Sequence, residues 1–381
     1  MAKHRIVLTG GGTGGHVYPA LSVAEQLKDD PDVEAILYIG AQGHLEERLA
    51  AERNIEFIGL SVAGLPRKLS FKLASWPFQM LSSMNRAKSI LEKFKPTAVL
   101  GTGGYASAPP LAAAMVTSVP YAVHEPDAHP GLVNRVFGKN AKLVSLGMEG
   151  AADQFHPVDG KVVVNGNPVG KKFVQAVGKD AARATFGLSP EPTTLLITGG
   201  SQGAQAINEA VLKALPELLA LEPVIQIIHQ VGEKNFADYK QRLDPAIVEN
   251  PRYHLRPYFD DLSTAYAASD LTVCRAGAMT ISELAVTGTP AIFIPYPFAA
   301  QDHQTFNANF IADKGAARVL MQSNLTADSF SKLLKEILFD SDKLSAMRDA
   351  MQRLGKPDAA ANLAQNLKEL STNYQQRKAE S

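Results

Sequence analysis

The stretch Ile-Val-Leu-Thr-Gly-Gly at residues 6–11 recurs as Leu-Leu-Ile-Thr-Gly-Gly at residues 195–200. In each copy a short apolar run leads directly into a glycine-rich turn, which is typical of a buried strand followed by a helix in an open α/β sheet. The two copies lie far apart in the chain and do not form a short-period repeat. They indicate that each half of the chain opens a sheet of its own.

Apolar runs alternate with helix-length segments through both halves. After the first turn, four apolar residues spaced i, i+3, i+4, i+7 predict one buried helix stripe. They are Ala20, Val23, Ala24 and Leu27. The predicted parallel strands cover residues 5–9, 35–39, 98–100, 121–123 and 161–164 in the first half, and 194–198, 224–228, 271–273 and 291–294 in the second. This order predicts an α/β fold with two Rossmann-like, doubly wound parallel sheets.

The length of 381 residues suits two domains. Gly and Pro punctuate the chain at residues 166–168, which places the linker there. We expect an N-terminal domain of residues 1–165 and a C-terminal domain of residues 166–355, facing a cleft. Residues 356–381 are polar and alanine-rich, and we expect this helical segment to pack back on the first domain.

Composition excludes several classes of protein. The 38 basic and 38 acidic side chains balance, so no net field draws the chain to nucleic acid. The lone Cys274 excludes a disulfide framework, and its apolar neighbours favour a packed thiol in a reducing compartment. The N-terminus lacks a signal-peptide pattern. The most apolar stretch, residues 111–123, is too short to span a bilayer, so membrane contact is expected to be peripheral.

Glycine-rich loops follow several predicted strands. Residues 10–15 lie between a strand and a helix, where missing Cβ atoms let a ligand approach backbone amides. Residues 101–105, 199–204 and 275–280 occupy similar positions. A structural turn explains one such loop, but four at strand ends favour a diphosphate site, because unpaired N–H groups and the positive ends of helix dipoles stabilise the anion.

Two other phosphate-binding sites do not fit the sequence. A dinucleotide site requires an acidic residue at the end of the second strand, and that strand ends as Ile39-Gly40-Ala41-Gln42. A Walker loop requires Gly-Lys-Ser/Thr, which does not follow. We therefore expect a nucleotide-sugar donor, without a metal or other cofactor.

The longer motifs resemble the MurG family of glycosyltransferases nearly from end to end. The resemblance implies the GT-B architecture and an inverting transfer of N-acetylglucosamine from UDP-N-acetylglucosamine to an undecaprenyl-diphosphate-linked muramyl peptide, which converts lipid I to lipid II. The motifs that carry it are residues 11–19, 101–105, His124-Glu125, Gly131-Leu132 with Asn134, residues 166–169, the Ser201 loop, residues 275–283, and Asp302-His303-Gln304 with Asn307-Ala308.

The resemblance implies that the C-terminal domain holds most of the donor. By this resemblance, an aromatic residue and a helix N-terminus surround uracil and diphosphate. A carboxylate binds ribose, and a side-chain amide with its neighbour binds the sugar hydroxyls. These residues are, in that order, Phe259; Gly277, Ala278, Met279 and Thr280; Glu283; and Gln304 with His303. Ser201 and Gln202 would touch phosphate or ribose.

The first domain offers a candidate general base. His16 has a side chain that titrates near neutral pH, so it suits removal of the acceptor hydroxyl proton, although it equally suits orienting the loop or binding the acceptor diphosphate. Thr13, Gly14, Gly15 and Asn134 are the further predicted substrate-binding residues of this domain. His124-Glu125 is a second candidate pair, with a structural hydrogen bond as its alternative.

Two positions depart from the family pattern. Asp127, also a predicted substrate-binding residue, stands where the family has an asparagine that contacts the donor sugar, and an ionised carboxylate only accepts hydrogen bonds. Gly170 replaces the customary arginine near the donor. We hypothesise that Lys171 or Lys172 supplies the charge without the bidentate geometry.

Residues 66–95 combine seven basic side chains and one acid with several large apolar residues. This composition predicts a patch that faces an anionic membrane at the cytoplasmic side of the plasma membrane, where cations meet headgroups and Trp and Phe settle at the interface. A core helix with a solvated basic face explains it equally well. The rival functions are a sugar-nucleotide epimerase of the same fold, a nicotinamide oxidoreductase and a silent sugar-nucleotide-binding module.

Overall fold

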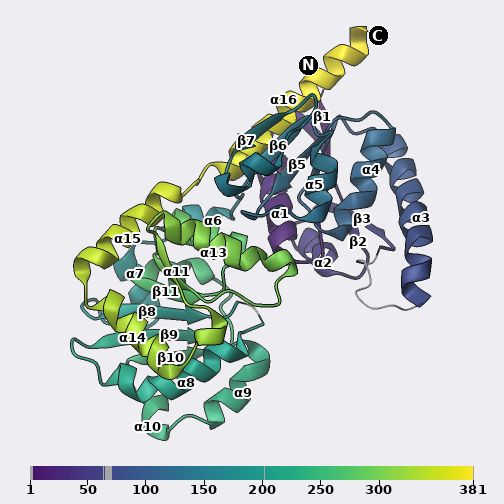
Figure 1. Ribbon diagram of the computed structural model, residues 1–381. Helices are drawn as coiled ribbons and strands as arrows, with labels where there is room; N and C mark the ends of the chain where they lie inside the picture. The colour runs from purple at the N-terminus through teal and green to yellow at the C-terminus, as the bar shows by residue number, and fades with distance from the viewer. Residues whose placement is uncertain (1–2, 63, 65–70, 201, 381) are drawn as a thin grey trace. The chain divides into compact units, whose positions relative to one another are not determined.

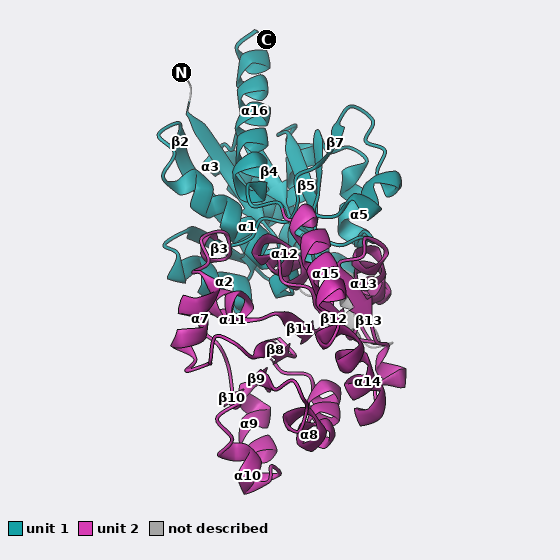
Figure 2. Cartoon of the chain, turned by 90° about the vertical axis from the view of Figure 1, so that its left-hand side faces the viewer, with its two compact units in different colours: residues 1–170, 356–381 teal, residues 171–355 magenta. Residues whose placement is uncertain are grey.

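A computed structural model describes residues 3–62, 64, 71–200 and 202–380, although the side chains of residues 71–76 lie outside the description. The chain divides into two compact units (Figure 2). Unit 1 comprises residues 1–170 and 356–381, and unit 2 comprises residues 171–355. Within the described residues, no helix has both the length and the apolar character needed to cross a bilayer.

Unit 1 contains a seven-stranded, parallel sheet in the order β3-β2-β1-β4-β5-β6-β7 (Figure 1). Leu8 in β1 pairs with Tyr38 in β2 on one side and with Leu100 in β4 on the other, so β1 lies inside the sheet. The strands are β1 His4–Thr9, β2 Val33–Ala41, β3 Glu56–Leu60, β4 Ala98–Gly101, β5 Tyr121–Glu125, β6 Leu143–Leu146 and β7 Lys161–Val164.

Helices cover both faces of this sheet. Helices α1, α2 and α16 share one apolar core with it, and α3, α4 and α5 pack over the other face. The predicted stripe of α1 is confirmed, because all four of its residues are fully buried. The helices are α1 Gly14–Lys28, α2 Leu45–Glu52, α3 Phe71–Phe94, α4 Ala108–Val116, α5 Leu132–Gly138 and α16 Ala359–Glu380, with 3-10 turns η1 Tyr105–Ser107 and η2 Glu149–Gln154.

Helix α16 belongs to unit 1 although unit 2 precedes it in the chain. Its residues Leu363 and Leu367 are fully buried in the same core as α1. A polar chain adds to this packing, because His4 Nδ1 lies 2.7 Å from Ser371 Oγ, which donates to Thr97 Oγ1 at 2.6 Å. The last helix is therefore an integral layer of unit 1.

Unit 2 contains a six-stranded, parallel sheet in the order β10-β9-β8-β11-β12-β13. The strands are β8 Thr193–Thr198, β9 Ile225–Gln230, β10 Tyr253–Arg256, β11 Leu271–Cys274, β12 Ala291–Phe293 and β13 Ala317–Val319. The helices are α6 Lys171–Val174, α7 Lys179–Thr185, α8 Gln205–Leu219, α9 Glu233–Gln241, α10 Pro245–Val248, α11 Leu262–Ala268, α12 Ala278–Thr287, α13 His303–Asp313, α14 Ala327–Leu338 and α15 Ser341–Leu354, with 3-10 turns η3 Ala300–Asp302 and η4 Gln322–Asn324. Two doubly wound parallel sheets confirm the predicted fold class.

Candidate functional site

The glycine loops of unit 1 meet where the connections of the sheet change direction. Strands β1 and β4 are neighbours, but β1 continues towards β2 and β4 towards β5, and such a switch point is where open α/β sheets bind ligands. The Gly11 amide donates to the Gly103 carbonyl at 3.3 Å. Gly104 has a φ of +75°, and a Cβ there would lie 1.9 Å from the Gly11 carbonyl oxygen. The two backbones approach so closely that only glycine fits.

His16 lies in the first turn of α1, directly after the first glycine loop. Its Nδ1 is 3.1 Å from the Thr102 carbonyl oxygen, which can only accept a hydrogen bond. This contact favours the tautomer with the proton on Nδ1 and the lone pair on Nε2. Thr13 is the N-cap residue of the same helix, and Gly14 and Gly15 are its first two residues, so these predicted residues directly precede His16.

The second candidate pair is buried in a hydrogen-bond network. His124 Nδ1 lies 3.0 Å from Ser145 Oγ, and its Nε2 lies 2.9 Å from Asn167 Oδ1. Burial lowers the pKa of His124 to about 4. Both ring nitrogens of His124 are engaged by buried protein side chains. This favours a structural hydrogen bond as the role of His124.

Glu125 organises the loop between β5 and α5. Its carboxylate accepts from the Asp127 and Gly131 amides at 3.0 Å each and from Asn134 Nδ2 at 2.9 Å. Burial raises the pKa of Glu125 to about 8 against the opposing effect of these donors. Asn134 is only 1% exposed and also donates to the His124 carbonyl, whereas Asp127 is half-buried at the surface of this loop.

Glu46 was not a predicted site residue, yet it lies against the first glycine loop. Its Oε1 accepts from the Ala41 amide at 3.0 Å and would lie 2.2 Å from a Cβ on Gly11. The side chain is fully buried, and among the described residues its Oε2 has no hydrogen-bond partner. Residues 45–52 have the charged composition of a solvated helix, so the sequence carried no signal for this burial.

In unit 2, the N-terminus of α12 follows the end of β11. Gly277 is the N-cap, and Ala278, Met279 and Thr280 form the first turn, whose amides have no intrahelical partner. Glu283 lies less than two turns further on, and its Oε2 accepts from the Tyr266 hydroxyl at 3.5 Å. Burial raises the pKa of Glu283 to about 8. The first-turn amides and this carboxyl group thus belong to the same short helix.

Arg275, which the sequence analysis noted only as part of a loop, points its guanidinium at carbonyl groups beside α12. It donates to the Ile294 and Pro295 carbonyls at 2.9 and 3.1 Å and to Gln322 Oε1 at 2.7 Å. No ion pair joins Arg275 to a carboxylate of the described residues. Its charge therefore adds to the positive field of the helix end.

The other predicted donor residues of unit 2 lie in two loops and in the first turn of α13. Phe259 is 8% exposed and packs edge-on against Phe186 with ring centroids 5.6 Å apart. Gln202 is exposed, while Ser201 lies outside the described residues. Gln304 Oε1 accepts from the Tyr296 amide at 2.9 Å, and His303 Nδ1 donates to the Ala300 carbonyl at 2.7 Å.

The lysines that follow Gly170 begin unit 2. Lys172 Nζ lies 3.5 Å from Asp261 Oδ1 and 3.2 Å from the Asp260 carbonyl. The positive charge of Lys172 opposes the rise in the pKa of Glu283. Lys172 is therefore close enough to Glu283 to interact with it electrostatically. Among the described residues, no group of three His, Cys, Asp or Glu side chains has the arrangement to hold a metal ion.

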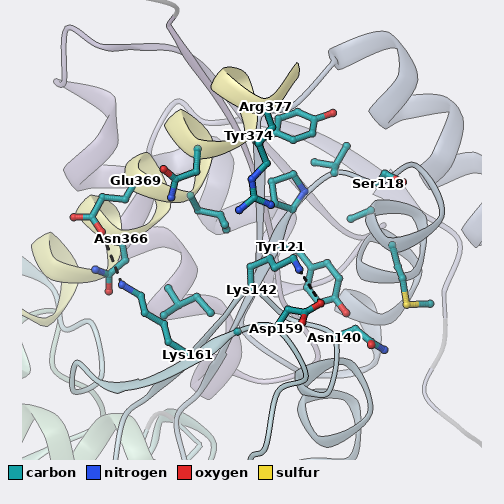
Figure 3. A pocket seen from close by; sticks show the side chains of 18 residues that line it. Ser118, Tyr121, Asn140, Lys142, Asp159, Lys161, Asn366, Glu369, Tyr374 and Arg377 are labelled. Atoms are coloured by element: carbon teal, nitrogen blue, oxygen red, sulfur yellow. Dashed lines mark ion pairs between the residues drawn. The ribbon is translucent and has the colours of Figure 1, made fainter. Parts of the chain in front are cut away.

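Figure 3 shows one cavity of unit 1, of about 570 Å³. It lies at the amino ends of β5 and β7, whereas the glycine loops of this unit follow the carboxyl ends of β1 and β4. It is lined by the first residues of β5 and β7, Tyr121 and Lys161, and by Glu369, Tyr374 and Arg377 of α16. Ligands of open α/β sheets collect at the carboxyl ends, so this cavity is separate from the candidate site.

Comparison with known proteins identifies the class. Residues 6–145 match the glycosyltransferase family 28 N-terminal domain, and residues 194–363 match its C-terminal domain. The crystal structure of Acinetobacter baumannii MurG has a TM-score of 0.78 and 30% identity, covering 96% of this chain and 99% of its own. The two sheets with their glycine loops are therefore those of a GT-B glycosyltransferase.

Sequence relatives narrow this class. A Halothermothrix orenii protein named UDP-N-acetylglucosamine--N-acetylmuramyl-(pentapeptide) pyrophosphoryl-undecaprenol N-acetylglucosamine transferase is 37% identical over 94% of this chain and 97% of its own. A Syntrophotalea carbinolica protein of the same name is 39% identical over 93% and 96%. The chain belongs to the MurG family. A UDP-N-acetylglucosamine 2-epimerase from Listeria monocytogenes, at 14% identity and a TM-score of 0.68, shares the fold alone.

Proposed function

We propose that the loops of unit 2 hold the donor and those of unit 1 the acceptor in the reaction of this family. The chain is a hexosyltransferase that moves N-acetylglucosamine from UDP-N-acetylglucosamine to the muramyl sugar of an undecaprenyl-diphosphate-linked pentapeptide, the reaction for which its relatives are named. An acceptor hydroxyl oxygen attacks the anomeric carbon, and the bond from that carbon to UDP breaks. The hydroxyl proton passes to His16 Nε2, and UDP leaves with the bonding electron pair.

The observation that carries this assignment is the N-terminus of α12, where the first-turn amides have no intrahelical partner, with Arg275 two residues before the N-cap and Glu283 on the same helix. Its first-turn amides bind the diphosphate and stabilise the charge that develops on the leaving group. Phe259 covers uracil, and Gln304 with His303 reads the sugar hydroxyls. In unit 1, Thr13, Gly14 and Gly15 present amides to the acceptor, while Asn134 and Glu125 fix the loop around Asp127.

A transfer assay tests the function directly. Purified protein should move labelled N-acetylglucosamine from its UDP donor to a muramyl-diphosphoryl-lipid analogue. Release of free sugar alone, or no turnover with the lipid acceptor, would contradict the assignment. Conversion of the donor to the C2 epimer would favour the epimerase alternative.

Glu283 should make donor binding depend on pH. If its carboxylate accepts hydrogen bonds from ribose, binding favours the ionised form, whereas its pKa of about 8 keeps the ligand-free group largely protonated at neutral pH. Affinity for UDP should therefore rise with pH up to about 8 and then level off, with proton release on binding below pH 8. Calorimetry in buffers of different ionisation enthalpy measures that release.

The matched variants are Glu283→Gln, which cannot titrate, and Glu283→Ala. Both should lose the pH dependence, and Glu283→Ala should raise the KM for the donor by about tenfold, the loss of one hydrogen bond to a charged group. Wild-type affinity that is flat between pH 6 and 9 would remove Glu283 from the ribose site.

We further propose that unit 1 binds an anionic membrane peripherally, at the cytoplasmic face of the plasma membrane, without a role for nucleic acid. The patch of residues 66–95 supports this where it is described. Phe78 is 75% and Leu81 is 56% exposed on α3, and Arg86, Lys88 and Lys93 are exposed on the same helix. The part formed by residues 66–70 and the side chains of residues 71–76 lies outside the described residues.

The double substitution Phe78→Ser with Leu81→Ser should lower binding to vesicles that contain anionic lipid. The loss is about 2 kcal/mol or more, because two large apolar side chains no longer enter the interface. Sedimentation with vesicles measures it, and activity on a water-soluble acceptor should stay unchanged. Val158→Ser, at a 76% exposed position outside α3, is the matched control. Equal vesicle binding by the double variant and the wild type would show that the exposed face of α3 is solvated and does not contact the membrane.

A further inference from the structure

The loop after β12 exposes two paired aromatic side chains. Tyr296 is 43% and Phe298 is 73% exposed, and their rings meet edge to face with centroids 5.6 Å apart. Single exposed apolar residues are common on protein surfaces, but an exposed aromatic pair beside polar binding groups is typical of a ligand site. The pair therefore requires an explanation beyond packing.

The base of this pair is fixed by residues already placed in the donor site. The Tyr296 amide donates to Gln304 Oε1 at 2.9 Å. The Arg275 guanidinium lies over the Tyr296 ring, 5.4 Å from its centroid, and donates to the carbonyls of the two residues before Tyr296. Phe298 therefore projects from a base that two donor-site side chains hold rigid.

The same loop stores backbone strain. Gln301 and Asp302 are consecutive non-glycine residues with φ of 53° and 55°. Thr305 Oγ1 donates to Asp302 Oδ1 at 2.6 Å, which holds the left-handed turn in front of α13. Strain of this kind, about 1 kcal/mol or more per residue, persists where the surrounding structure fixes it, and it clusters at ligand-binding sites.

We propose that Phe298 is a specificity-determining residue that packs its ring against the C–H face of the transferred hexosamine. This inference rests on the proposed function, in which Gln304 binds the hydroxyls of that sugar. A hexosamine has polar edges and apolar C–H faces. A side-chain amide can therefore bind the hydroxyls at its edge while an aromatic ring packs against its face. Phe298 contacts the sugar and leaves the nucleotide to α12 and Phe259.

The test compares UDP with UDP-N-acetylglucosamine as ligands in calorimetry. Phe298→Ala should weaken binding of UDP-N-acetylglucosamine by about three- to tenfold, the range of a lost aromatic contact, and leave binding of UDP unchanged. Phe298→Tyr keeps the ring and should bind both ligands as the wild type does. Phe339→Ala removes a 41% exposed phenylalanine at the end of α14 and should change neither affinity.

Three outcomes would overturn this role for Phe298. Phe298→Ala could bind both ligands normally, weaken both equally, or change only the KM for the lipid acceptor. The second outcome would make the loop a support for the nucleotide, and the third would place Phe298 at the acceptor. Failure of the proposed function is distinguishable, because the wild-type protein itself would then not discriminate UDP-N-acetylglucosamine from UDP or transfer the sugar.

Discussion

Replacing His16 by alanine is expected to lower kcat by about 10²- to 10⁴-fold, the usual contribution of a positioned general base. The contact of Nδ1 with the Thr102 carbonyl directs the lone pair of the ring to Nε2, where it can take the acceptor proton. Single-turnover transfer of labelled sugar measures the chemical step apart from product release. At saturating donor, where the titration of Glu283 no longer limits binding, the acidic limb of the pH profile of kcat should disappear with the imidazole.

The matched variant His16→Asn separates the roles that the sequence left open. An asparagine amide can donate to the Thr102 carbonyl as Nδ1 does, but it is not a base. If His16 removes the proton, His16→Asn should be as impaired as His16→Ala. Recovery of kcat in His16→Asn would assign the residue to loop orientation, and a change confined to the KM for the lipid acceptor would assign it to diphosphate binding.

Replacing Asp270 by alanine is expected to lower the free energy of unfolding by about 3–5 kcal/mol, the cost of breaking a buried ion pair. Its Oδ2 accepts from Arg183 Nη2 at 2.6 Å and from the Thr194 amide at 2.7 Å, and its Oδ1 pairs with Lys179 and Arg348. The side chains of Arg183 and Asp270 are only 5% and 10% exposed, so the substitution leaves a buried cation. Urea unfolding of the full chain, with hydrogen exchange at β8 and β11, measures the loss.

Two variants control for this prediction. Asp270→Asn keeps an acceptor for the Thr194 amide but loses the charge, so its stability should lie between those of the wild type and Asp270→Ala. Glu209→Ala breaks the bidentate pair with Arg242, whose partners are 41% and 35% exposed, and should change stability far less. Equal losses of unfolding free energy in Asp270→Ala and Glu209→Ala would mean that burial does not increase the contribution of the Asp270 ion pairs to stability.

The predicted strands were those with continuous apolar runs, and all of them are present in the two sheets. Strands β3, β6, β10 and β13 were not predicted. Three of these are edge strands whose exposed positions break the apolar run, as in Glu56–Leu60 and Tyr253–Arg256. The fourth, β6, contains Ser145, which is fully buried because His124 and Asn165 satisfy its hydroxyl.

The sequence motifs predicted where backbone segments meet, but they gave no indication of side chains whose position depends on tertiary packing. The glycine loops indicated the strand ends that meet in unit 1, because adjacent strands end at one edge of a parallel sheet. Glu46 and Arg275 became visible only in three dimensions, through a buried contact with Gly11 and through bonds to the carbonyls after β12. Neither contact has a periodic signature, since each joins residues far apart in the chain.

The late position of α16 constrains the order in which the protein folds during synthesis. Leu363, Ala364 and Leu367 are translated after all of unit 2, yet they complete a core that begins with Ile6 and Leu8. Residues 171–355 are contiguous and can become compact on the ribosome while the earlier-made sheet still exposes the part of its apolar face that α16 covers. Translational pausing before residue 359 would therefore prolong the exposure of that face to chaperones.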